Sequence, residues 1–585
     1  SSWSYTWSIP TLVYKGMRRA VAAVSTYTSG IMRYKHLAYA TEPSSINERI
    51  RKVTIMRSRQ AFPELEEAVR AAKARARRVQ GCELTIAEAL DITANKTAKS
   101  GITGMSAKDL KAGKTGQVIE IYDLLGKSII EQPWNQVNIM PKSEIFVKTP
   151  QKPSKKPARI IAYPHLEMRV AEKMVLGHIG PATVKAVCGD AYGFVPPKER
   201  VQKLLKMWDS KSQPAGFTCD TVCFDSTITP EDVAVERDIY CEAASHESTK
   251  VRIRTLHDGL YSGGPMVMQG VQVGERHCRA SGVFTTSSSN TMTCFLKVSA
   301  AAKKAGIKKP SWLICGDDTV CVFESQGLED DTRRLGLFAA YMGQMGAPQG
   351  EVPRPHYSLE LLDSCSSNIS SAQTRYGLYH YMTRDPRIPY ARISLEGKGF
   401  NPLGSMLGYI LANYPAIWVS RVIAVKFMQE LLALDKPSSI TFDWYGNNYT
   451  VPVSKIPYII QSLHGKQAWA ITQYTSREVS RVAQSLKDNT MRPLRYYKRT
   501  ARSLVASARR RGGVLAFLAN TLLSWVHGTH VNLEPKKVEA ASSFNFFEPY
   551  SQDIYDQEPR RWGLPIYLGL FAGIAGLLAL CLHLV

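Results

Sequence analysis

The stretch SWLICGDDTVCVF, residues 311–323, decides the fold that this sequence predicts. It contains two short apolar runs, WLIC and TVCVF, that are rich in β-forming residues, as buried strands are. Gly316 stands between them beside Asp317, and a glycine next to an aspartate is typical of a tight hairpin turn. The stretch therefore predicts a buried hairpin with Asp317 and Asp318 at its tip. Because desolvated carboxylates are costly unless they are paired or bind metal, these aspartates indicate a cation or a charged partner.

The charge of the chain points to a polyanionic partner. The 585 residues include 74 Lys and Arg against 50 Asp and Glu, which gives a formal net charge of +24. This length allows about three or four domains, and an apolar content of 44% is ordinary for a globular protein. Such an excess of positive charge favours nucleic acid or an anionic membrane surface as partner, with a merely basic soluble protein as the alternative.

The cysteines argue against a zinc site. Eleven of them are scattered from Cys82 to Cys581 without a CxxC pair, and Cys219 and Cys223 have no matching second pair or histidine cluster. The odd number and the scattered spacing fit a reducing compartment. No apolar run follows Ser1, so we expect no signal peptide.

The C-terminal stretch, residues 563–585, predicts a membrane anchor. It carries no formal charge, and about 20 apolar residues are enough to span a bilayer. Arg560, Arg561 and Trp562 precede it, and a basic and aromatic flank belongs at the cytoplasmic interface. We therefore expect a tail anchor behind an irregular linker, residues 531–562, with the bulk of the protein in the cytosol. A buried core helix is the alternative.

Elsewhere the sequence mixes helix and strand signals. Residues 64–79 begin with acids and end with bases, which predicts a helix aligned with its dipole. Residues 147–164 form a stretch rich in proline and lysine that runs into a short strand. Strand-like runs carry the carboxylates from about residue 180 to about 370. After that the pattern becomes helical, with an interruption at Pro415.

One hairpin is expected within the helical region. The stretch SITFDWYGNNYTVPVS, residues 439–454, has β-rich arms, and Gly446, Asn447 and Asn448 are suited to its turn. Aromatic side chains surround that turn: Phe442, Trp444, Tyr445 and Tyr449. Taken alone, this pattern is that of an ordinary surface turn.

A second pair of aspartates lies upstream of Asp317. In FTCDTVCFDSTITPED, Asp220 and Asp225 are spaced as DxxxxD. The apolar surroundings predict a strand through about Phe224 and then a turn, and alternate residues of a strand share a face. We expect Asp220 to join Asp317 and Asp318 at a metal centre, and Asp225 to lie just beyond it, free to contact a sugar.

An all-carboxylate cluster indicates magnesium chemistry. Three clustered carboxylates would repel one another without cations. Two Mg²⁺ ions about 4 Å apart would neutralise them and clamp the attacking and leaving oxygens of a phosphoryl transfer. Mg²⁺ prefers carboxylate and phosphate oxygens, which suits a set without histidine or cysteine.

Two further motifs complete an ordered series. Residues 280–295, ASGVFTTSSSNTMTCF, read as a Ser/Gly loop that opens a helix, and such a loop can position a template backbone or recognise a ribose 2′-hydroxyl. Basic side chains at Lys142, Lys156 and Arg159 suit a triphosphate. Each motif is weak alone. The order of basic loop, DxxxxD, SGxxxTxxxN and GDD is a strong signal for a nucleotidyl-transferring enzyme.

The same motifs resemble those of the RNA-dependent RNA polymerases of the hepatitis C virus group, the hepaciviruses and related pegiviruses. The resemblance is carried by CFDSTITPED, RASGVFTTSSSNTMTCF, CGDD, LELLDSCSSNIS, KKPARIIAYP and the opening SYTW, and it covers essentially the whole chain. It implies an α+β right-hand polymerase whose finger loops reach the thumb. The implied parts are fingers (1–187 and 226–286), catalytic palm (188–225 and 287–369), thumb (370–530), priming hairpin (440–454), linker (531–562) and membrane anchor (563–585).

The resemblance also implies roles for single residues. Asp220 and Asp317 would be the main ligands of two Mg²⁺ ions, for which Mn²⁺ can substitute, with the Thr221 carbonyl and Asp318 in support. Asp225, Ser281 and Asn290 would check the ribose 2′-hydroxyl of the incoming nucleotide. The other residues expected to bind this nucleotide are Thr286, Lys142, Lys156, Arg159 and Arg49.

Primer-independent initiation is a further implication. The initiating nucleotide would be held by Ser366, Arg384 and Arg392, with Cys365 and Ser366 marking the primer-grip turn. Tyr445 and Tyr449 on the hairpin would give the first base pair a stacking platform. The general acid for pyrophosphate release stays unassigned, since no lysine occurs between Lys309 and Lys398.

The implied partners are RNA template and product, nucleoside triphosphates, the membrane, other viral replication proteins and further copies of the chain. The implied location is the cytosolic face of membranes derived from the host endoplasmic reticulum, where the polymerase would replicate a positive-strand genome. Two alternatives remain open at this point. One is a reverse transcriptase or DNA polymerase with the same palm, and the other is a membrane-anchored RNA-binding scaffold whose acids are structural.

Overall fold

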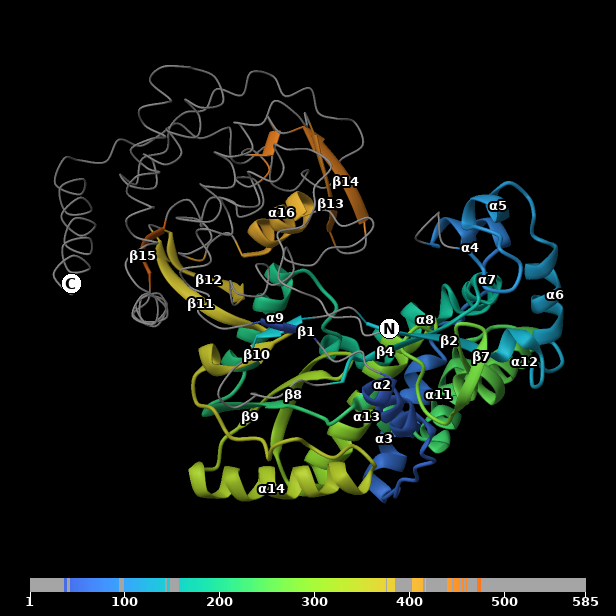
Figure 1. The fold of residues 1–585 in the computed structure, drawn as a ribbon. Coiled ribbons are helices and arrows are strands. Elements are labelled where there is room, and N and C mark those ends of the chain that lie inside the picture. The colour runs from blue at the N-terminus through green and yellow to red at the C-terminus, as the bar shows by residue number, and fades with distance from the viewer. Residues whose placement is uncertain are drawn as a thin grey trace, which may run out of the picture. The chain divides into compact units, whose positions relative to one another are not determined.

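The structure is a computed structural model and falls into two compact units, each described by itself (Figure 1). Unit 1 comprises Ser1–Ser4, Ala38–Glu144 and Ser154–Cys365, and unit 2 comprises Tyr5–Leu37, Ile145–Pro153 and Ser366–Val585. The structure describes residues 36–38, 43–93, 99–142, 145–147, 157–374, 376–384, 402–413, 416, 439–444, 447–452, 455–456, 459 and 471–474.

The core of unit 1 is a three-stranded antiparallel sheet of order β5 (Pro214–Cys219), β9 (Asp318–Glu324) and β8 (Lys308–Cys315). Strands β8 and β9 form the expected hairpin. Cys315 pairs with Asp318, so Gly316 and Asp317 form a two-residue turn. Gly316 has a φ of +64°, a left-handed conformation that suits glycine at the first turn position. The hairpin prediction is confirmed.

This sheet is buried because its apolar residues pack against helices. Figure 1 shows α14 (Leu328–Gln344) lying along β8 and β9. Phe217 of β5 is fully buried, and its ring contacts those of Trp312, Phe323 and Phe338, with 5.1 Å between the centroids of Phe217 and Phe338. Helix α13 (Thr286–Ala305) also packs against β8. A buried sheet explains why both arms of the hairpin read as continuous apolar runs.

The rest of unit 1 is mainly helical around a second sheet of order β4-β2-β6-β7. Its strands are β2 (Val137–Pro141), β4 (Ile160–Pro164), β6 (Gly264–Met268) and β7 (Val271–Arg276). The remaining helices are α2 (Pro43–Thr54), α3 (Pro63–Ala76), α4 (Ile86–Asp91), α5 (Ala107–Lys111), α6 (Gly116–Leu125), α7 (Leu166–Leu176), α8 (Ile179–Cys188), α9 (Pro197–Asp209), α10 (Phe224–Thr227), α11 (Pro230–Ala243) and α12 (Glu247–Leu256). Short elements are η1 (Pro133–Asn135), η2 (Gly189–Ala191), η3 (His257–Tyr261), η4 (Leu359–Leu361) and β10 (Asp363–Ser364).

Local sequence signals fix several of these helix ends. The helix expected over residues 64–79 forms as α3, with Pro63 at its start. Thr229 caps α11 by accepting a hydrogen bond from the Asp232 amide, and the Asp232 side chain accepts one from the Thr229 amide in return. Gly306 ends α13 with a φ of +78°.

Unit 2 contains strands as well as helix. Strand β1 (His36–Ala38) pairs with β3 (Ile145–Val147), and β11 (Ser367–Thr374) pairs with β12 (Gly377–Arg384) and β15 (Ile471–Tyr474). The prediction of a helical pattern directly after about residue 370 was therefore wrong, because β11 and β12 continue to Arg384. Helix α16 (Pro402–Asn413) follows and ends before Pro415, as expected.

The predicted hairpin of unit 2 is present with a different turn. Strand β13 (Ser439–Trp444) pairs with β14 (Asn447–Pro452) in antiparallel register. Asn447 pairs with Trp444 and Asn448 with Asp443, so both asparagines lie in β14 and not in the turn to which the sequence assigned them. Cross-strand pairing extends the ladder further than turn propensity alone suggests.

Several predictions concern residues outside the described part of the chain. They include the linker at 531–562 and the membrane anchor at 563–585. Within the described ranges, no helix has the length and apolar character needed to cross a bilayer. The division into fingers, palm and thumb stays a prediction.

Replacing Phe217 with alanine is expected to destabilise unit 1 by about 3–5 kcal/mol, because it leaves a cavity among three aromatic rings. Urea denaturation followed by tryptophan fluorescence measures the loss. Phe194→Ala is the control, since Phe194 is 45% exposed and surface changes usually stay within about 0.5 kcal/mol. Equal denaturation midpoints for the two variants would show that the aromatic cluster does not support the sheet.

Candidate active site

The turn that carries Asp317 is anchored to helix α13. The amide of Gly316 donates a hydrogen bond of 2.8 Å to Oγ1 of Thr291, whose hydroxyl in turn donates to the carbonyl of Ser287. Sγ of Cys294, one turn further along α13, lies 3.1 Å from Oγ1 of Thr319 in β9. The helix therefore sets the position of the turn, and Asp317 is exposed at its tip.

Asp318 is held from the other side. One of its carboxylate oxygens accepts a hydrogen bond of 3.1 Å from the backbone amide of Cys365. Burial raises the pKa of Asp318 to about 6, and repulsion by Asp363 and Asp317 adds to the effect. Cys365 and Ser366 have φ angles of 50° and 60°, a left-handed pair that is uncommon for residues other than glycine. The predicted primer-grip turn is thus a distinct backbone feature.

Asp220 follows directly after β5 and is held by residues 347–350. Its carbonyl accepts a hydrogen bond of 2.7 Å from the Gly350 amide, and its own amide donates to Oε1 of Gln349. The same Gln349 side chain donates through Nε2 to Oγ1 of Thr221, which is buried. A Cβ at Gly350 would lie 3.1 Å from a carboxylate oxygen of Asp220, so the segment follows the aspartate closely. Gln349 and Gly350 carry no recognisable signal in the sequence.

The expected strand through Phe224 does not form. Strand β5 ends at Cys219, and Cys223 adopts a left-handed φ of 48° before the short helix α10 begins at Phe224. Asp225 therefore belongs to a helix, and its separation from Asp220 comes from the intervening turn. The strand prediction was wrong because a short run of β-branched and apolar residues does not by itself distinguish a strand from a turn. Here the run forms a turn, and Val222 is exposed.

Asp220, Asp225 and Asp318 each interact electrostatically with Asp317. Although Asp317 lies at an exposed tip, the surrounding protein partly desolvates its carboxylate, and this burial raises its pKa. The negative charges of Asp225 and Asp220 raise the pKa further, whereas Arg159 lowers it. Burial likewise raises the pKa of Asp225, and Arg159 is among the groups that oppose this rise. Asp220, Asp225 and Arg159 therefore each lie within electrostatic reach of Asp317, and the role of this set stays a prediction.

Asn290 of α13 is bound directly to Asp225. Its side-chain Nδ2 donates a hydrogen bond of 2.7 Å to Oδ1 of Asp225. Asn290 is buried, and its Oδ1 accepts a bond of 2.9 Å from Nε of Arg279. Arg279 also pairs with the buried carboxylate of Glu236. The sequence predicted Asp225 and Asn290 as partners of one sugar but gave no sign of Arg279 and Glu236, because buried ion pairs leave no periodic pattern.

The loop before α13 docks on β4. Oγ of Ser281 accepts a hydrogen bond of 3.0 Å from the Ala162 amide, and the Gly282 amide donates to the Ala162 carbonyl over 2.7 Å. A Cβ at Gly282 would lie 2.6 Å from that carbonyl oxygen, so only glycine allows this approach. The hydroxyl of Thr286 donates to the Ala280 carbonyl. The prediction of a Ser/Gly loop that opens a helix is confirmed.

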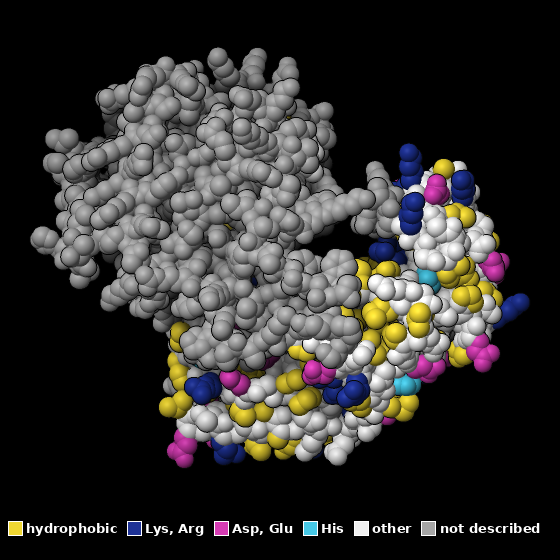
Figure 2. Space-filling model, in the orientation of Figure 1, with side chains coloured by type: hydrophobic (Ala, Val, Ile, Leu, Met, Phe, Trp, Pro, Cys, Tyr) yellow, Lys and Arg dark blue, Asp and Glu magenta, His cyan; other side chains and the backbone are white. Residues whose placement is uncertain are grey.

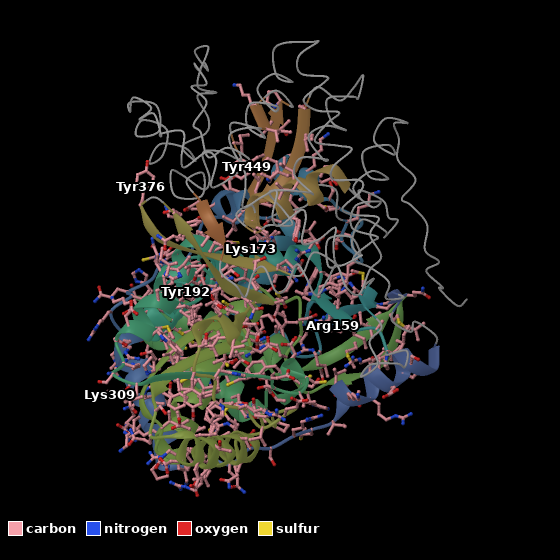
Figure 3. The ribbon with its side chains drawn as sticks, turned by 90° about the vertical axis from the view of Figure 1, so that its left-hand side faces the viewer. Arg159, Lys173, Tyr192, Lys309, Tyr376 and Tyr449 are labelled. Atoms are coloured by element: carbon pink, nitrogen blue, oxygen red, sulfur yellow. The ribbon has the colours of Figure 1, made fainter. Side chains whose placement is uncertain are left out.

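The predicted triphosphate-binding residues are partly described. Arg159, labelled in Figure 3, directly precedes β4, and its carbonyl accepts a hydrogen bond of 2.7 Å from the Lys142 amide. Arg49 of α2 donates to the Pro157 carbonyl over 3.4 Å and approaches Sγ of Cys223 at 3.8 Å. These contacts connect α2, β2 and β4 near the start of α10. Lys156 lies outside the described residues.

The residues assigned to initiation belong to unit 2. Arg384 ends β12, and its carbonyl accepts a hydrogen bond from the Tyr409 hydroxyl. Tyr449 of β14 is half-buried, with its ring centroid 5.7 Å from that of Phe442. Arg392 and Tyr445 lie outside the described residues. Their placement as a set stays a prediction.

The side chains around Asp317 offer the oxygen ligands that a hard divalent cation prefers. They are carboxylates without histidine or cysteine side chains among the expected ligands, which suits Mg²⁺. Burial raises the pKa of Asp317 and Asp318, neighbouring carboxylates raise both further, and a bound cation would oppose this rise. In the part of the chain that the structure describes, no three His, Cys, Asp or Glu side chains form a closed metal-ligand cluster. The aspartates thus share one electrostatic environment without a preassembled cage.

Positive and negative side chains are mixed on the surface of unit 1 that Figure 2 shows. On the face in Figure 2, Lys and Arg side chains are interspersed with Asp and Glu over the described residues of unit 1. Within these residues and on this face, the positive excess is therefore not gathered into one continuous patch. Arg333 and Arg334, basic residues that follow the hairpin, pair with Asp330 on α14.

A buried glutamate supports the loop before α13. Glu172 of α7 is fully buried, and its Oε1 accepts hydrogen bonds from the Phe284 amide over 3.0 Å and from the Tyr261 hydroxyl over 2.7 Å. Burial raises its pKa from 4.5 to about 7, while these two hydrogen bonds and the charges of Lys173 and Arg169 oppose the rise. The protonation state of Glu172 is therefore linked to folding near neutral pH.

Comparison with known proteins places these features in a family. The family described as viral RNA dependent RNA polymerase matches residues 4–510. The chain is 47% identical to the genome polyprotein of Hepatitis GB virus B over an alignment of 589 positions, which covers 99% of the chain and 20% of that polyprotein. It is 39% identical to the genome polyprotein of Hepatitis C virus genotype 2b (isolate JPUT971017) over an alignment of 540 positions, which covers 91% of the chain and 18% of the polyprotein. The chain thus spans about a fifth of the length of these relatives.

Replacing Glu172 with glutamine should change how stability depends on pH. A carboxyl whose pKa is raised on folding stabilises the protein most below about pH 4.5, and this contribution is lost as pH rises through about 7. From pH 5 to pH 8 the free energy of unfolding of Glu172→Gln, measured by urea denaturation, should therefore rise relative to the unaltered chain by up to about 3 kcal/mol. Glu120→Gln, at an exposed position on α6, controls for the loss of one carboxylate. A difference that stays constant over this range would contradict the linkage.

Proposed function

The chain belongs to the family of viral RNA-dependent RNA polymerases, and from that premise we propose that it replicates a positive-strand viral RNA genome by template-directed nucleotidyl transfer. The observation that carries the proposal is the convergence of Asp220, which directly follows β5, on the turn that holds Asp317. Each comes from a different part of the chain, and the pairing of Cys219 in β5 with Thr319 in β9 brings the two together. Structural acids have no need for this arrangement, which argues against an RNA-binding scaffold.

Polymerases of this family generally use divalent metal ions. In our proposal Asp220, Asp317 and the Thr221 carbonyl hold two Mg²⁺ ions, for which Mn²⁺ can substitute, and Asp318 supports them. Such ions, when bound, supply charge neutralisation and Lewis acidity to the reacting phosphate and hydroxyl oxygens. The protein contributes position: Gly316 and Thr291 fix the turn, and Gln349 and Gly350 fix Asp220. Catalysis then rests on alignment and electrostatic stabilisation of an in-line attack on the α-phosphorus.

Selection of the incoming nucleotide would use two neighbouring groups. The basic side chains of Lys142, Lys156, Arg159 and Arg49 bind the triphosphate. The polar set of Asp225, Asn290, Ser281 and Thr286 faces the sugar, where a 2′-hydroxyl can donate to a carboxylate and accept from an amide. The hydrogen bond between Asn290 and Asp225 supports this assignment and favours ribonucleotides over deoxyribonucleotides. A reverse transcriptase or DNA polymerase would gain nothing from such a pair.

Initiation without a primer is the second part of the proposal. The antiparallel hairpin β13–β14 offers Tyr449, together with Tyr445, as a stacking platform for the first base pair. Ser366, Arg384 and Arg392 would hold the initiating nucleotide. What supports this is the hairpin itself and the resemblance of the surrounding motifs to those of the hepaciviruses.

The proposal extends to location and partners. Residues 563–585 would anchor the chain at the cytosolic face of membranes derived from the endoplasmic reticulum, where RNA, other viral replication proteins and further copies of the chain are partners. The apolar C-terminal sequence and its basic flank support the anchor.

Replacing Asp317 with asparagine should reduce elongation by at least about 100-fold, since loss of one electrostatic group at a reacting centre typically has an effect of this size. RNA binding should be largely retained. Incorporation of nucleoside triphosphates on a primed RNA template with Mg²⁺, beside an RNA-binding titration, measures both. Glu329→Gln, an exposed position on α14, is the matched control. Full turnover by Asp317→Asn under Mg²⁺ would refute the assigned role.

Replacing Tyr449 with alanine should reduce unprimed initiation by about tenfold and leave elongation of a primed template intact, because base–aromatic stacking is worth about 1–3 kcal/mol. Parallel primed and unprimed assays measure the two steps. Thr450→Ala, at an exposed position on the same strand, is the control. Equal losses in both assays would instead indicate a general structural role for the hairpin.

A further inference from the structure

Arg279 connects three elements of the proposed nucleotide site. Its backbone amide donates a hydrogen bond of 3.1 Å to the carbonyl of Asp225 in α10. Its Nε donates to Oδ1 of Asn290 in α13 over 2.9 Å, and its Nη2 pairs with the carboxylate of Glu236 in α11. The side chain is 1% exposed, so it contacts neither solvent nor a substrate directly. A single residue thus binds both members of the Asp225–Asn290 pair.

These bonds fix the orientation of the Asn290 amide. A guanidinium group only donates hydrogen bonds, so the atom of Asn290 that faces Arg279 is the carbonyl oxygen. The amide nitrogen is therefore directed to Asp225, where it donates over 2.7 Å. That bond uses one of the two amide hydrogens and one oxygen of Asp225. The remaining hydrogen and the remaining oxygen can serve a sugar hydroxyl, which both donates and accepts.

Glu236 holds the guanidinium in place. It is fully buried and pairs with Arg279, and it also accepts a hydrogen bond of 2.9 Å from the Thr293 hydroxyl. Taking two charges out of water costs about as much as their attraction returns, so such a pair adds little to stability on its own. The pair does fix the orientation of the Arg279 side chain, because the planar guanidinium donates in only a few directions. With Nη2 held by Glu236, Nε is directed to Asn290.

We propose that Arg279, held by Glu236, is a positioning residue that keeps Asp225 and Asn290 in the arrangement that distinguishes ribose from deoxyribose. The inference rests on the proposed polymerase function and deepens it. Arg279 acts only through the pair, so its loss affects substrates that carry a 2′-hydroxyl more than those that lack one. A residue that merely stabilised the fold would affect both kinds of substrate equally.

A neighbouring ion pair offers a matched control. Lys297 of α13 donates to Asp232 of α11 over 2.8 Å, and both side chains are at most 3% exposed. Arg59 pairs with the other oxygen of Asp232 at 2.7 Å. This cluster joins the same two helices by the same kind of buried interaction, but its bonds are to Asp232 and not to Asn290 or Asp225. Disrupting it tests destabilisation without touching the pair.

The test uses the full chain and compares kcat/KM for a nucleoside triphosphate with kcat/KM for the matching 2′-deoxynucleotide on one RNA template. Arg279→Lys, which cannot reproduce the forked donation, should lower the ratio by about tenfold, because the buried hydrogen bond that orients Asn290 is then misplaced. Lys297→Met should lower both values in proportion and leave the ratio unchanged. The paired variant Arg279→Met with Glu236→Met removes both charges together, which keeps the fold accessible, and should lower the ratio similarly.

An unchanged ratio in the Arg279 variants, with Asn290→Ala lowering it, would overturn the role of Arg279 and leave the proposed ribose check intact. An unchanged ratio in Asn290→Ala as well would contradict the ribose check itself and the role of Arg279 with it. Failure of the unaltered chain to incorporate ribonucleotides would contradict the polymerase assignment, on which both depend.

Discussion

The site depends on the antiparallel register of β5 on β9. Cys219 pairs with Thr319, so the residue after β5 emerges beside the tip of the β8–β9 hairpin. That register places Asp220 next to Asp317 and Asp318 although they lie far apart in the chain. A shift by one residue would turn the apolar face of β5 away from the core, and burial of Phe217 prevents it. The core packing and the convergence of the carboxylates therefore have one cause.

Around that register, the supports of the site come from unrelated parts of the chain. Helix α13 fixes the turn through Thr291, the segment before β10 fixes Asp220 through Gln349, and the Cys365 amide binds Asp318. Arg279 holds Asn290 on Asp225. Each support is a hydrogen bond that fixes the backbone or the side chain of a site residue. Rigid placement of repelling carboxylates is what a polymerase site requires of its protein before cations and substrate bind.

The sequence predicted local structure well where the signal is local. The hairpin around Gly316, the helix from Pro63 and the loop that opens α13 follow from turn chemistry and periodicity, and the structure confirms them. It misplaced Phe224 and Asn447, because apolar and turn-forming residues fit strand or turn equally well until tertiary pairing decides. It gave no sign of Arg279, Glu236 or Gln349, whose roles arise only when distant segments meet. Family motifs supplied the functional assignment that periodicity could not.

The central claim is that Asp220 and Asp317 share divalent cations. Crystals of the full chain soaked with Mn²⁺ and measured at the manganese absorption edge test it directly, because anomalous scattering locates the ions without reference to activity. If the two aspartates share the ions, two peaks lie within ligation distance of the Asp220 and Asp317 carboxylates, and both are lost in Asp220→Asn. Peaks elsewhere, or two aspartates that ligate no common ion, would contradict it.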